Sequence, residues 1–535
     1  MAISISEPTP LRWLVAAGND QIWYEGDAVA GTMIELVAAR DDIDTSDQLT
    51  VVPAYGKVFV VNGTNLKVMD FQNTKITTTN LGSHPPDRGN ILAGGSSGAQ
   101  MVVDYITSLS GACTIYGYRT TEAQFEAETV TGTDDDGNAI SFTGTAGVTP
   151  DPPDTPPHWY DWTVYGGDTT NYGSMPARAH LGCVSGGRLV LNNADYPHQA
   201  PTSAAGNPWD WNIYRTTADR ATVIGSGSAG QIGDVVRALI PARDGQLIIG
   251  CATSMHIMID NPAYGGQMVD INDVGIFGSH SACFDGDGNL YFWGTGGIYR
   301  LARGAAQVEC ITAASLPNLI KDTGANPALH RITMGFDAVR QGIKVCVTLL
   351  ADGSSENYWY DTQTRGFFPD THANDHGVYS IFQYDANDPD YRGLLLGCTD
   401  GYIRVHDDDA TDDDGVAIDS YVAFGPIPLA EDGRDGSIAA FDLALAGGAS
   451  GDVDDATVEV WAEDVAETVL EDLEAGTNPN LSMTFTGPGR ARGAKRRRSV
   501  RGAYAGVKVG NDTASETWGM EKLILDPGNP GRRLR

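Results

Sequence analysis

A short apolar strand that follows a turn glycine recurs along most of this 535-residue chain, and this repeat limits the folds that the chain can adopt. The last four intervals between copies are 58, 43, 54 and 51 residues, which lie in or near the period of roughly 40 to 50 residues typical of a propeller blade. Aspartate-glycine pairs supply tight turns between these strands and their partners. The pattern predicts a chain of antiparallel hairpins. The copies begin at Gly56, Gly187, Gly245, Gly288, Gly342 and Gly393.

The predicted fold class is all-β, with a β-propeller of about six to eight blades over residues 1–405 and a smaller C-terminal β-sandwich-like domain over residues 406–535. The interval of 131 residues between Gly56 and Gly187 breaks the period. We interpret it as at least one degenerate blade plus a loop-rich insertion at about residues 104–180. A series of β-sandwiches without closure is the alternative, and closure is preferred because it hides the edges of sheets.

The charge of the chain restricts its partners. With 35 Lys+Arg against 69 Asp+Glu, the net charge is −34. Such a surface repels nucleic acid and anionic membranes, so sequence-specific DNA binding is not expected. No membrane span is expected, because no apolar run approaches 18 residues. The N-terminal residues lack the basic region of a secretory signal, which favours folding in a cytoplasm. Seven scattered cysteines without a CxxC pair predict buried free thiols.

Basic residues gather near the C-terminus, where residues 490–535 hold 12 Lys+Arg and 4 Asp+Glu. Strand-like alternation continues after this cluster, so we expect the basic side chains to lie on a folded β-domain rather than on a nucleic-acid-binding tail. A docking surface for an acidic neighbouring subunit and a simple solvated face are equally compatible with the charges. The candidate docking residues are Arg490, Arg492, Lys495, Arg496, Arg497, Arg498 and Arg501.

Short motifs of enzymes occur, but each lacks its context. Residues 94–98 match a nucleophile elbow, which belongs in a parallel α/β sheet. Residues 225–230 match GxGxxG without a following βαβ unit, and residues 372–376 lack the glutamate of HExxH. Acidic runs offer oxygen ligands for calcium without the EF-hand spacing, so solvated turns are expected. We therefore expect no enzyme activity, cofactor or metal. The calcium alternative falls on Asp407, Asp409, Asp412 and Asp414.

Residues 187–212 carry a more specific pattern than the repeat alone. The strand Gly187–Leu191 is followed by Tyr196-Pro197, by Ser203 and by the motif Asn-Pro-Trp-Asp-Trp-Asn at 207–212. Together with residues 230–257 and an Arg-rich strand that precedes Gly531-Arg-Arg, it resembles the β-propeller tail nozzle (tail hub, or tail tubular B-type) proteins of short-tailed bacteriophages. The resemblance is spread over most of the chain and is weakest at residues 133–157.

The resemblance implies a structural virion protein that forms a ring, a homohexamer, at the distal end of a short tail and assembles in the bacterial host cytoplasm. Its implied partners are adaptor or portal-side tail proteins, fibre or spike proteins, and genomic DNA that passes through the channel during ejection. An acidic channel wall would let DNA slide, because it offers no counterion release. A tail component of a long-tailed phage, a carbohydrate-binding propeller and a propeller hydrolase are the alternatives. The expected anchors of the 187–212 loop are Tyr196, Pro197, Trp209 and Trp211.

Overall fold

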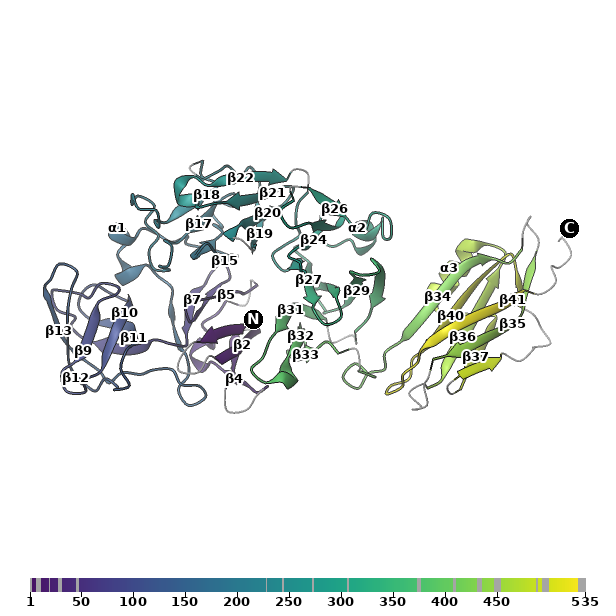
Figure 1. Ribbon diagram of the computed structural model, residues 1–535, viewed down its shortest axis with the longest axis horizontal. Helices are drawn as coiled ribbons and strands as arrows, with labels where there is room; N and C mark the ends of the chain where they lie inside the picture. The colour runs from purple at the N-terminus through teal and green to yellow at the C-terminus, as the bar shows by residue number, and fades with distance from the viewer. Residues whose placement is uncertain are drawn as a thin grey trace. The chain divides into compact units, whose positions relative to one another are not determined.

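The chain folds almost entirely into antiparallel β-sheets, which form two compact units (Figure 1). Unit 1 holds Met1–Asp370 and Asp375–His406, and unit 2 holds Thr371–Asn374 and Asp407–Arg535. The division falls beside the boundary that the repeat predicts after Val405. This computed structural model describes residues 2–5, 11–18, 20–26, 31–44, 48–227, 229–242, 245–271, 274–305, 307–372, 377–407, 410–430, 435–446, 454–486, 489–492 and 500–527.

Seven successive sheets, which we call blades 1 to 7, build unit 1 in the described ranges. Blade 7 has three strands and each of the others has four. In chain order the blades are β1–β4 (Ala2–Ile5, Leu11–Gly18, Gln21–Glu25, Met33–Glu35), β5–β7 with β14 (Thr50–Ala54, Lys57–Val61, Leu66–Asp70, His158–Asp161), β15–β18 (Gly182–Ser185, Arg188–Leu191, Ala200–Thr202, Thr222–Ile224), β19–β22 (Val236–Pro241, Leu247–Cys251, Met255–Ile259, Gln267–Ile271), β23–β26 (Ala282–Phe284, Leu290–Gly294, Gly297–Leu301, Val308–Cys310), β27–β30 (His330–Asp337, Gly342–Leu349, Ser355–Asp361, Phe367–Asp370) and β31–β33 (Val378–Tyr384, Gly393–Cys398, Ile403–Val405).

Each copy of the sequence repeat forms the second strand of its blade, as β6, β16, β20, β24, β28 or β32. A second strand has a neighbouring strand on both sides and a neighbouring blade against each face. All residues of β6, β16, β20 and β24 are therefore buried. Apart from Lys57 at the start of β6 and Arg188 at the start of β16, their sequences are continuous apolar runs rather than alternating ones. The glycines that precede these strands take left-handed backbone angles, with φ of 69° at Gly56 and 85° at Gly288, which a tight hairpin turn requires.

The blades close into a ring, because every junction between neighbours has its own apolar cluster. The last junction joins blade 7 to blade 1, where Leu14 packs with Tyr384 and Leu395. At the same junction Arg12 Nη1 lies 2.8 Å from Asp385 Oδ2, and the Tyr384 hydroxyl donates to buried Glu25. The predicted β-propeller of about six to eight blades is confirmed, and the open series of sandwiches is wrong.

The insertion lies between β7 and β14, the third and fourth strands of blade 2, and spans residues 71–157. The predicted interval of 104–180 is therefore displaced, and the long gap in the repeat contains no degenerate blade. The short strand β14 follows the proline-rich end of the insertion and completes blade 2. The sequence pattern did not reveal this strand. Sequence reasoning also missed blade 1, whose strands lack the repeat.

The inserted segment forms a six-stranded sheet that closes on itself, which we call the inserted barrel. After β13 the chain returns to β8, where Lys75 N donates to Val148 O at 2.8 Å and Thr145 N to Thr77 O at 2.9 Å. Figure 1 shows β9–β13 as a group beside β5 and β7. The sheet order is β13-β12-β9-β10-β11-β8, and the strands from β8 to β13 are Thr74–Thr78, Ile91–Gly94, Gln100–Ile106, Cys113–Arg119, Glu128–Thr133 and Ala139–Gly144.

Unit 2 is a sandwich of two sheets around one apolar core. One sheet has the order β34-β40-β36-β37, and in the other β35 pairs with β38 and β39 along one edge and with β41 along the other. Helix α3 (Ala466–Ala475) contacts β34, β36 and β40. Strands β34 to β41 are Ser420–Pro428, Gly436–Leu445, Ala456–Glu463, Leu481–Phe485, Gly489–Arg492, Val500–Gly502, Tyr504–Asn511 and Met520–Pro527.

The helices of the described residues are short, and none of them is long and apolar enough to cross a membrane. All seven cysteines are free, as predicted, and five of them are buried, whereas Cys283 and Cys310 are partly exposed. Whereas α3 belongs to unit 2, unit 1 has the α-helices α1 (Thr169–Tyr172) and α2 (Leu319–Thr323). It also has 3-10 turns at Val37–Ala39, Tyr165–Gly167, Pro262–Tyr264 and Pro389–Tyr391.

Substituting Tyr384→Phe tests the closure of the ring. The change removes a hydrogen bond to the buried carboxylate of Glu25, so we expect the free energy of unfolding to fall by about 1.5–3 kcal/mol. Urea denaturation followed by tryptophan fluorescence measures it. The control is Tyr402→Phe on the same blade, at a side chain that is 67% exposed, with an expected change below about 0.5 kcal/mol. Equal stability of the two variants would contradict this role of Tyr384.

Candidate functional site: the joint between propeller and inserted barrel

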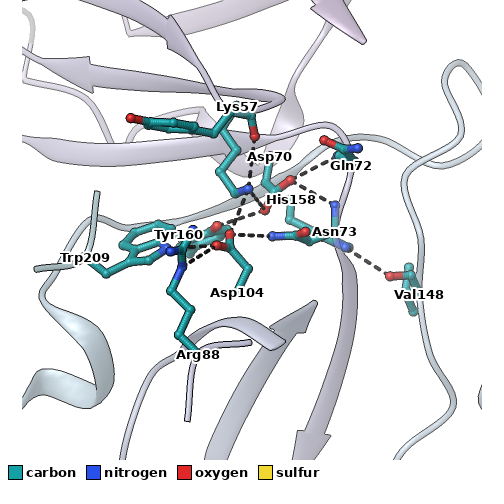
Figure 2. Close-up of polar contacts among 11 residues, drawn as sticks. Lys57, Asp70, Gln72, Asn73, Arg88, Asp104, Val148, His158, Tyr160 and Trp209 are labelled. Atoms are coloured by element: carbon teal, nitrogen blue, oxygen red, sulfur yellow. Dashed lines mark hydrogen bonds and ion pairs between the residues drawn. The ribbon is translucent and has the colours of Figure 1, made fainter. Parts of the chain in front are cut away.

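A cluster of buried and partly buried polar side chains lies where the inserted barrel meets blade 2 (Figure 2). Blade 2 contributes Lys57 at the start of β6, Asp70 at the end of β7, and Tyr160 on β14. The barrel contributes Arg88 and Asp104, the latter beside an irregularity in the register of β10. We call this cluster the joint. The joint connects the inserted barrel with blade 2, which the chain itself joins after β7 and before β14.

The charges of the joint pair with one another. Lys57 Nζ lies 2.9 Å from Asp104 Oδ2 and 3.8 Å from Asp70 Oδ2. Arg88 Nε donates to Asp104 Oδ1 at 3.1 Å, and Asn73 Nδ2 donates to Asp104 Oδ2 at 3.0 Å. The joint thus holds two cations and two carboxylates, so its charges neutralise one another. Lys57 and Asp70 are buried, Asp104 is largely covered and Arg88 is one third exposed, and charges that are taken out of water need such pairing.

The protonation states at the joint follow from this pairing. Burial would raise the pKa of Asp104, but the charges of Lys57 and Arg88 outweigh it and hold that pKa well below its usual range. Burial would likewise lower the pKa of Lys57, which is 3% exposed, but Asp70 and Asp104 raise it. Both groups therefore stay charged at neutral pH. Because Lys57 stays protonated, the joint does not offer an amine base or nucleophile.

Asp70 is held by its backbone as well as by Lys57. Its Oδ1 accepts hydrogen bonds from the backbone N–H groups of Gln72 and Asn73, each at 3.0 Å. Its Oδ2 accepts one from the Tyr160 hydroxyl at 2.9 Å. Asp70 therefore shapes the turn through which the chain leaves blade 2 for the barrel.

A stack of aromatic rings lies beside the charges. Tyr105 of the barrel stacks on Trp209 with ring centroids 4.2 Å apart, and Tyr116 stacks on Tyr160 at 4.1 Å. Trp209 is fully buried, and its Nε1 donates to Asp104 Oδ1 at 3.4 Å. The loop of blade 3 that follows β17 thus inserts an indole between blade 2 and the barrel.

The other expected anchors of the 187–212 loop differ in how far they are buried. Trp211 is 3% exposed, and its Nε1 donates to Pro208 O at 3.0 Å. Tyr196 is not an anchor, because its side chain is 56% exposed; this turn is shaped by Asn193, whose side-chain oxygen accepts from the backbone of Tyr196 at 3.3 Å. Pro197 is also exposed, but its carbonyl accepts from Val236 N of blade 4 at 2.9 Å.

The sequence motifs of enzymes have structural roles in the fold. Residues 94–98 form the hairpin between β9 and β10, and the residues after them form the strand β10 rather than the helix that a nucleophile elbow requires. Ser96 Oγ donates to Glu128 Oε2 at 2.8 Å rather than to a histidine. In the GxGxxG segment Gly225 N donates to Ala229 O at 3.3 Å, which makes a tight turn and no helix N-terminus.

A serine just before β21, a histidine on β21 and an aspartate on β22 also lie close together. Ser254 Oγ lies 3.3 Å from His256 Nε2, and His256 Nδ1 lies 2.7 Å from Asp270 Oδ1. However, Asp234 Oδ2 lies 3.3 Å from the same Ser254 Oγ. A carboxylate at this position opposes the negative charge that develops in acyl transfer. The arrangement therefore favours a structural network over a nucleophile.

The candidate calcium and docking residues are described only in part. Asp412 Oδ1 accepts from Gly415 N at 2.7 Å, as in an ordinary turn. Among the described side chains no group of three or more His, Cys, Asp or Glu is placed to hold a metal ion. Arg501 is exposed on β39, and Arg490 and Arg492 lie on β38. Outside the described residues lie Asp408, Asp409, His376, Lys495, Arg496, Arg497 and Arg498.

A cavity of about 210 Å³ lies between blades 3 and 4, lined by Arg188, Thr202, Leu247 and Met258 among others. Arg188 is 3% exposed. Its Nη1 and Nη2 make five hydrogen bonds, four to backbone carbonyls and one to Asn261 Oδ1. Because these donors are used within the fold, the cavity has no free guanidinium edge to recognise a ligand.

Sequence reasoning missed the residues of the joint. The available signal was a charged residue within otherwise apolar runs, as in Lys57 before Val-Phe-Val-Val and Asp104 after Met-Val-Val. Such residues are rarely buried unless they are paired. The pairing itself connects residues 47 positions apart in two different sheets, so no local pattern could identify the partners.

Comparisons with known proteins show distant structural similarity to β-propeller proteins. An extracellular domain from B. thetaiotaomicron matches with 11% identity and a TM-score of 0.30, over 81% of this chain and 48% of that one. The chain thus spans about half of the length of that match. A protein from Lactobacillus plantarum matches with 12% identity and a TM-score of 0.29, over 63% of this chain and 96% of that one. No family model and no curated protein sequence matches.

Substituting Asp104→Asn tests the joint. The change leaves Lys57 buried with only Asp70 near it, so we expect the free energy of unfolding to fall by about 3 kcal/mol, as measured by urea denaturation. The matched control is Asp136→Asn on the exposed turn after β12, with an expected change below about 0.5 kcal/mol. Combining Asp104→Asn with Lys57→Met should cost less than Asp104→Asn alone. A purely additive double variant would contradict the pairing.

The stability of the propeller should also depend on acid pH through Asp104. Because the pKa of Asp104 is lower in the folded chain than its ordinary value of 3.8, the unfolded chain takes up the proton first as the pH falls. Its contribution is fully present above about pH 5 and is lost as the pH falls below about 4. Thermal unfolding between pH 3 and pH 6 measures this. The Asp104→Asn variant should show a smaller loss than the wild type, and an equal loss would contradict this assignment.

Proposed function

We propose that this chain is a structural virion protein, the subunit of a ring at the distal end of a bacteriophage tail, as in the nozzle proteins that it resembles. The ring is a homohexamer through which DNA passes during ejection and on which fibre or spike proteins assemble. It would bind adaptor or portal-side proteins on its other side and assemble in the bacterial cytoplasm. It would act without a cofactor and without catalysis.

The single observation that carries the proposal is the position of Trp209. The motif that gives the resemblance its specificity is the Trp-Asp-Trp segment, and its first indole is fully buried between the inserted barrel and blade 2. A binding loop of a lectin or an enzyme would present such a ring to its ligand. Here the indole packs one folded part against another, which suits a structural protein.

The charges of the joint support the same function. Lys57, Arg88, Asp70 and Asp104 pair with one another at the joint, which favours a fixed connection over a substrate site. The inserted barrel leaves the propeller at the outermost strand pair of blade 2, β7 and β14. A barrel clamped at the rim is suited to contact a neighbouring subunit or a fibre.

The net charge of −34 supports a conduit rather than a DNA-binding protein. A channel wall with this excess of carboxylates repels phosphates, so DNA passes without the release of counterions that makes it adhere to basic walls. A reconstruction of the assembled ring with a lumen dominated by Arg and Lys would exclude this part of the proposal.

Labelling of virions tests the function. Phage particles that carry a peptide tag on this chain are bound by gold-conjugated antibody and imaged by negative-stain electron microscopy. We expect gold at the distal end of the tail, because the ring is placed there, and none on untagged control particles. Gold on the capsid, or tagged chain only in the unassembled fraction, would refute the proposal. Gold along a long tail would favour the long-tailed alternative.

A further inference from the structure

Strand β34 is an edge of the first sheet of unit 2. Within the described residues it pairs only with β40, over the register from Ser420 opposite Asn511 to Pro428 opposite Tyr504. The other side of an edge strand presents alternate backbone N–H and C=O groups without a strand to receive them. Such an edge accepts an added strand from another chain.

The side chains of β34 are unusually exposed for their place in the sheet. Val422 lies opposite Val509 and Phe424 opposite Val507. Directly opposed residues share a face of the sheet, and both of these partners are fully buried in the core of the sandwich. Yet Val422 is 40% and Phe424 is 37% exposed. The core-facing side of the sheet is thus uncovered at β34.

The first half of β34 also lacks the features that protect edge strands. Residues 420–424 read Ser-Tyr-Val-Ala-Phe and contain no charged residue, proline or glycine. Natural edges usually carry lysine, proline or a bulge to prevent pairing with other chains. In β34 these appear only from Gly425 onward, where the register shifts.

Two edges of unit 2 differ in the charge of the residues on or beside them. Helix α3 contacts β34 and carries four acidic residues and no basic one. In contrast, the edge of the second sheet opposite β41 consists of β38 and β39, on which Arg490, Arg492 and Arg501 lie. The acidic edge and the basic edge belong to different sheets of one sandwich. The two edges are therefore complementary in charge.

We propose that β34 is the docking edge for a second copy of this chain, which adds its basic edge, β38 with β39, beside β34. Main-chain hydrogen bonds provide the pairing, the apolar groups at Val422 and Phe424 become covered, and the positive charge of the β38 and β39 edge complements the negative charge of α3. Because the two surfaces differ, the contact is head-to-tail and can propagate around a ring. For the closure of that ring the inference rests on the proposed function, whereas the contact itself does not.

Photo-crosslinking tests the contact in the full-length chain. A benzophenone amino acid replaces Val422, or Ser482 on the other edge strand, β37, as the matched control. Unlabelled and nitrogen-15-labelled copies are mixed, irradiated and mapped by mass spectrometry, and the same chains are irradiated within assembled particles. We expect mixed-isotope links from position 422 to residues 489–492 and 500–502 of a second copy, at a yield at least about fivefold above that from position 482.

Charge provides an independent readout. Combining Arg490→Glu with Arg492→Glu should lower the yield from position 422 at least about threefold, as should raising NaCl from 0.05 to 0.5 M, because salt screens exposed charges. An unchanged circular dichroism spectrum and unfolding temperature would show that the variant is folded.

Three outcomes overturn the inference: links from position 422 to another protein, links to another part of the second copy, or yields no higher than from position 482 in both preparations. Gold labelling away from the tail, with these links intact, would refute the proposed function and leave the contact standing.

Discussion

The propeller depends on one constraint, which is that both faces of every blade must be covered by another blade. Second strands such as β20 and β24 are apolar along their whole length, so an uncovered blade would expose a continuous hydrophobic surface. Six junctions join consecutive blades, but the seventh must join the two ends of unit 1. Leu14, Tyr384 and Leu395 provide that junction, and without it blades 1 and 7 would each have one apolar face in water.

The joint solves a related problem at the rim. An insertion between two paired strands of a blade separates them by the length of the inserted segment, and β14 must still find its place beside β7. Asp70 shapes the exit turn and binds the Tyr160 hydroxyl of β14, while Lys57 connects both to Asp104 of the barrel. Removing one member of such a cluster is more damaging than never having it, because the remaining charges stay buried. The cluster therefore favours one arrangement of barrel and blade.

Part of the fold and of the joint could be predicted from the sequence. The second strands are identifiable because a doubly covered strand is a short apolar run after a turn glycine, as in Gly245–Cys251. Blade 1 has no such run, and β14 is four residues long beside a proline-rich segment, so neither has a local signal. The burial of Trp209 agrees with its expected role as an anchor, whereas Tyr196 is exposed because Asn193 and not the ring shapes that turn. Lys57 and Asp104 are conspicuous as single residues, but their pairing is a tertiary property.

The contact that closes the ring has a consequence for the order in which the chain acquires its structure. Glu25 and Tyr384 are 359 residues apart in sequence, so during synthesis blade 1 emerges long before the blade that covers its second face. Contacts of such separation form late, because the entropy of the intervening chain must first be overcome by other structure. Blade 1 must therefore remain partly uncovered until blade 7 has emerged, which is the period when an exposed apolar face is most prone to aggregation. In the same way, β14 cannot complete blade 2 until the barrel that precedes it in the chain has been made.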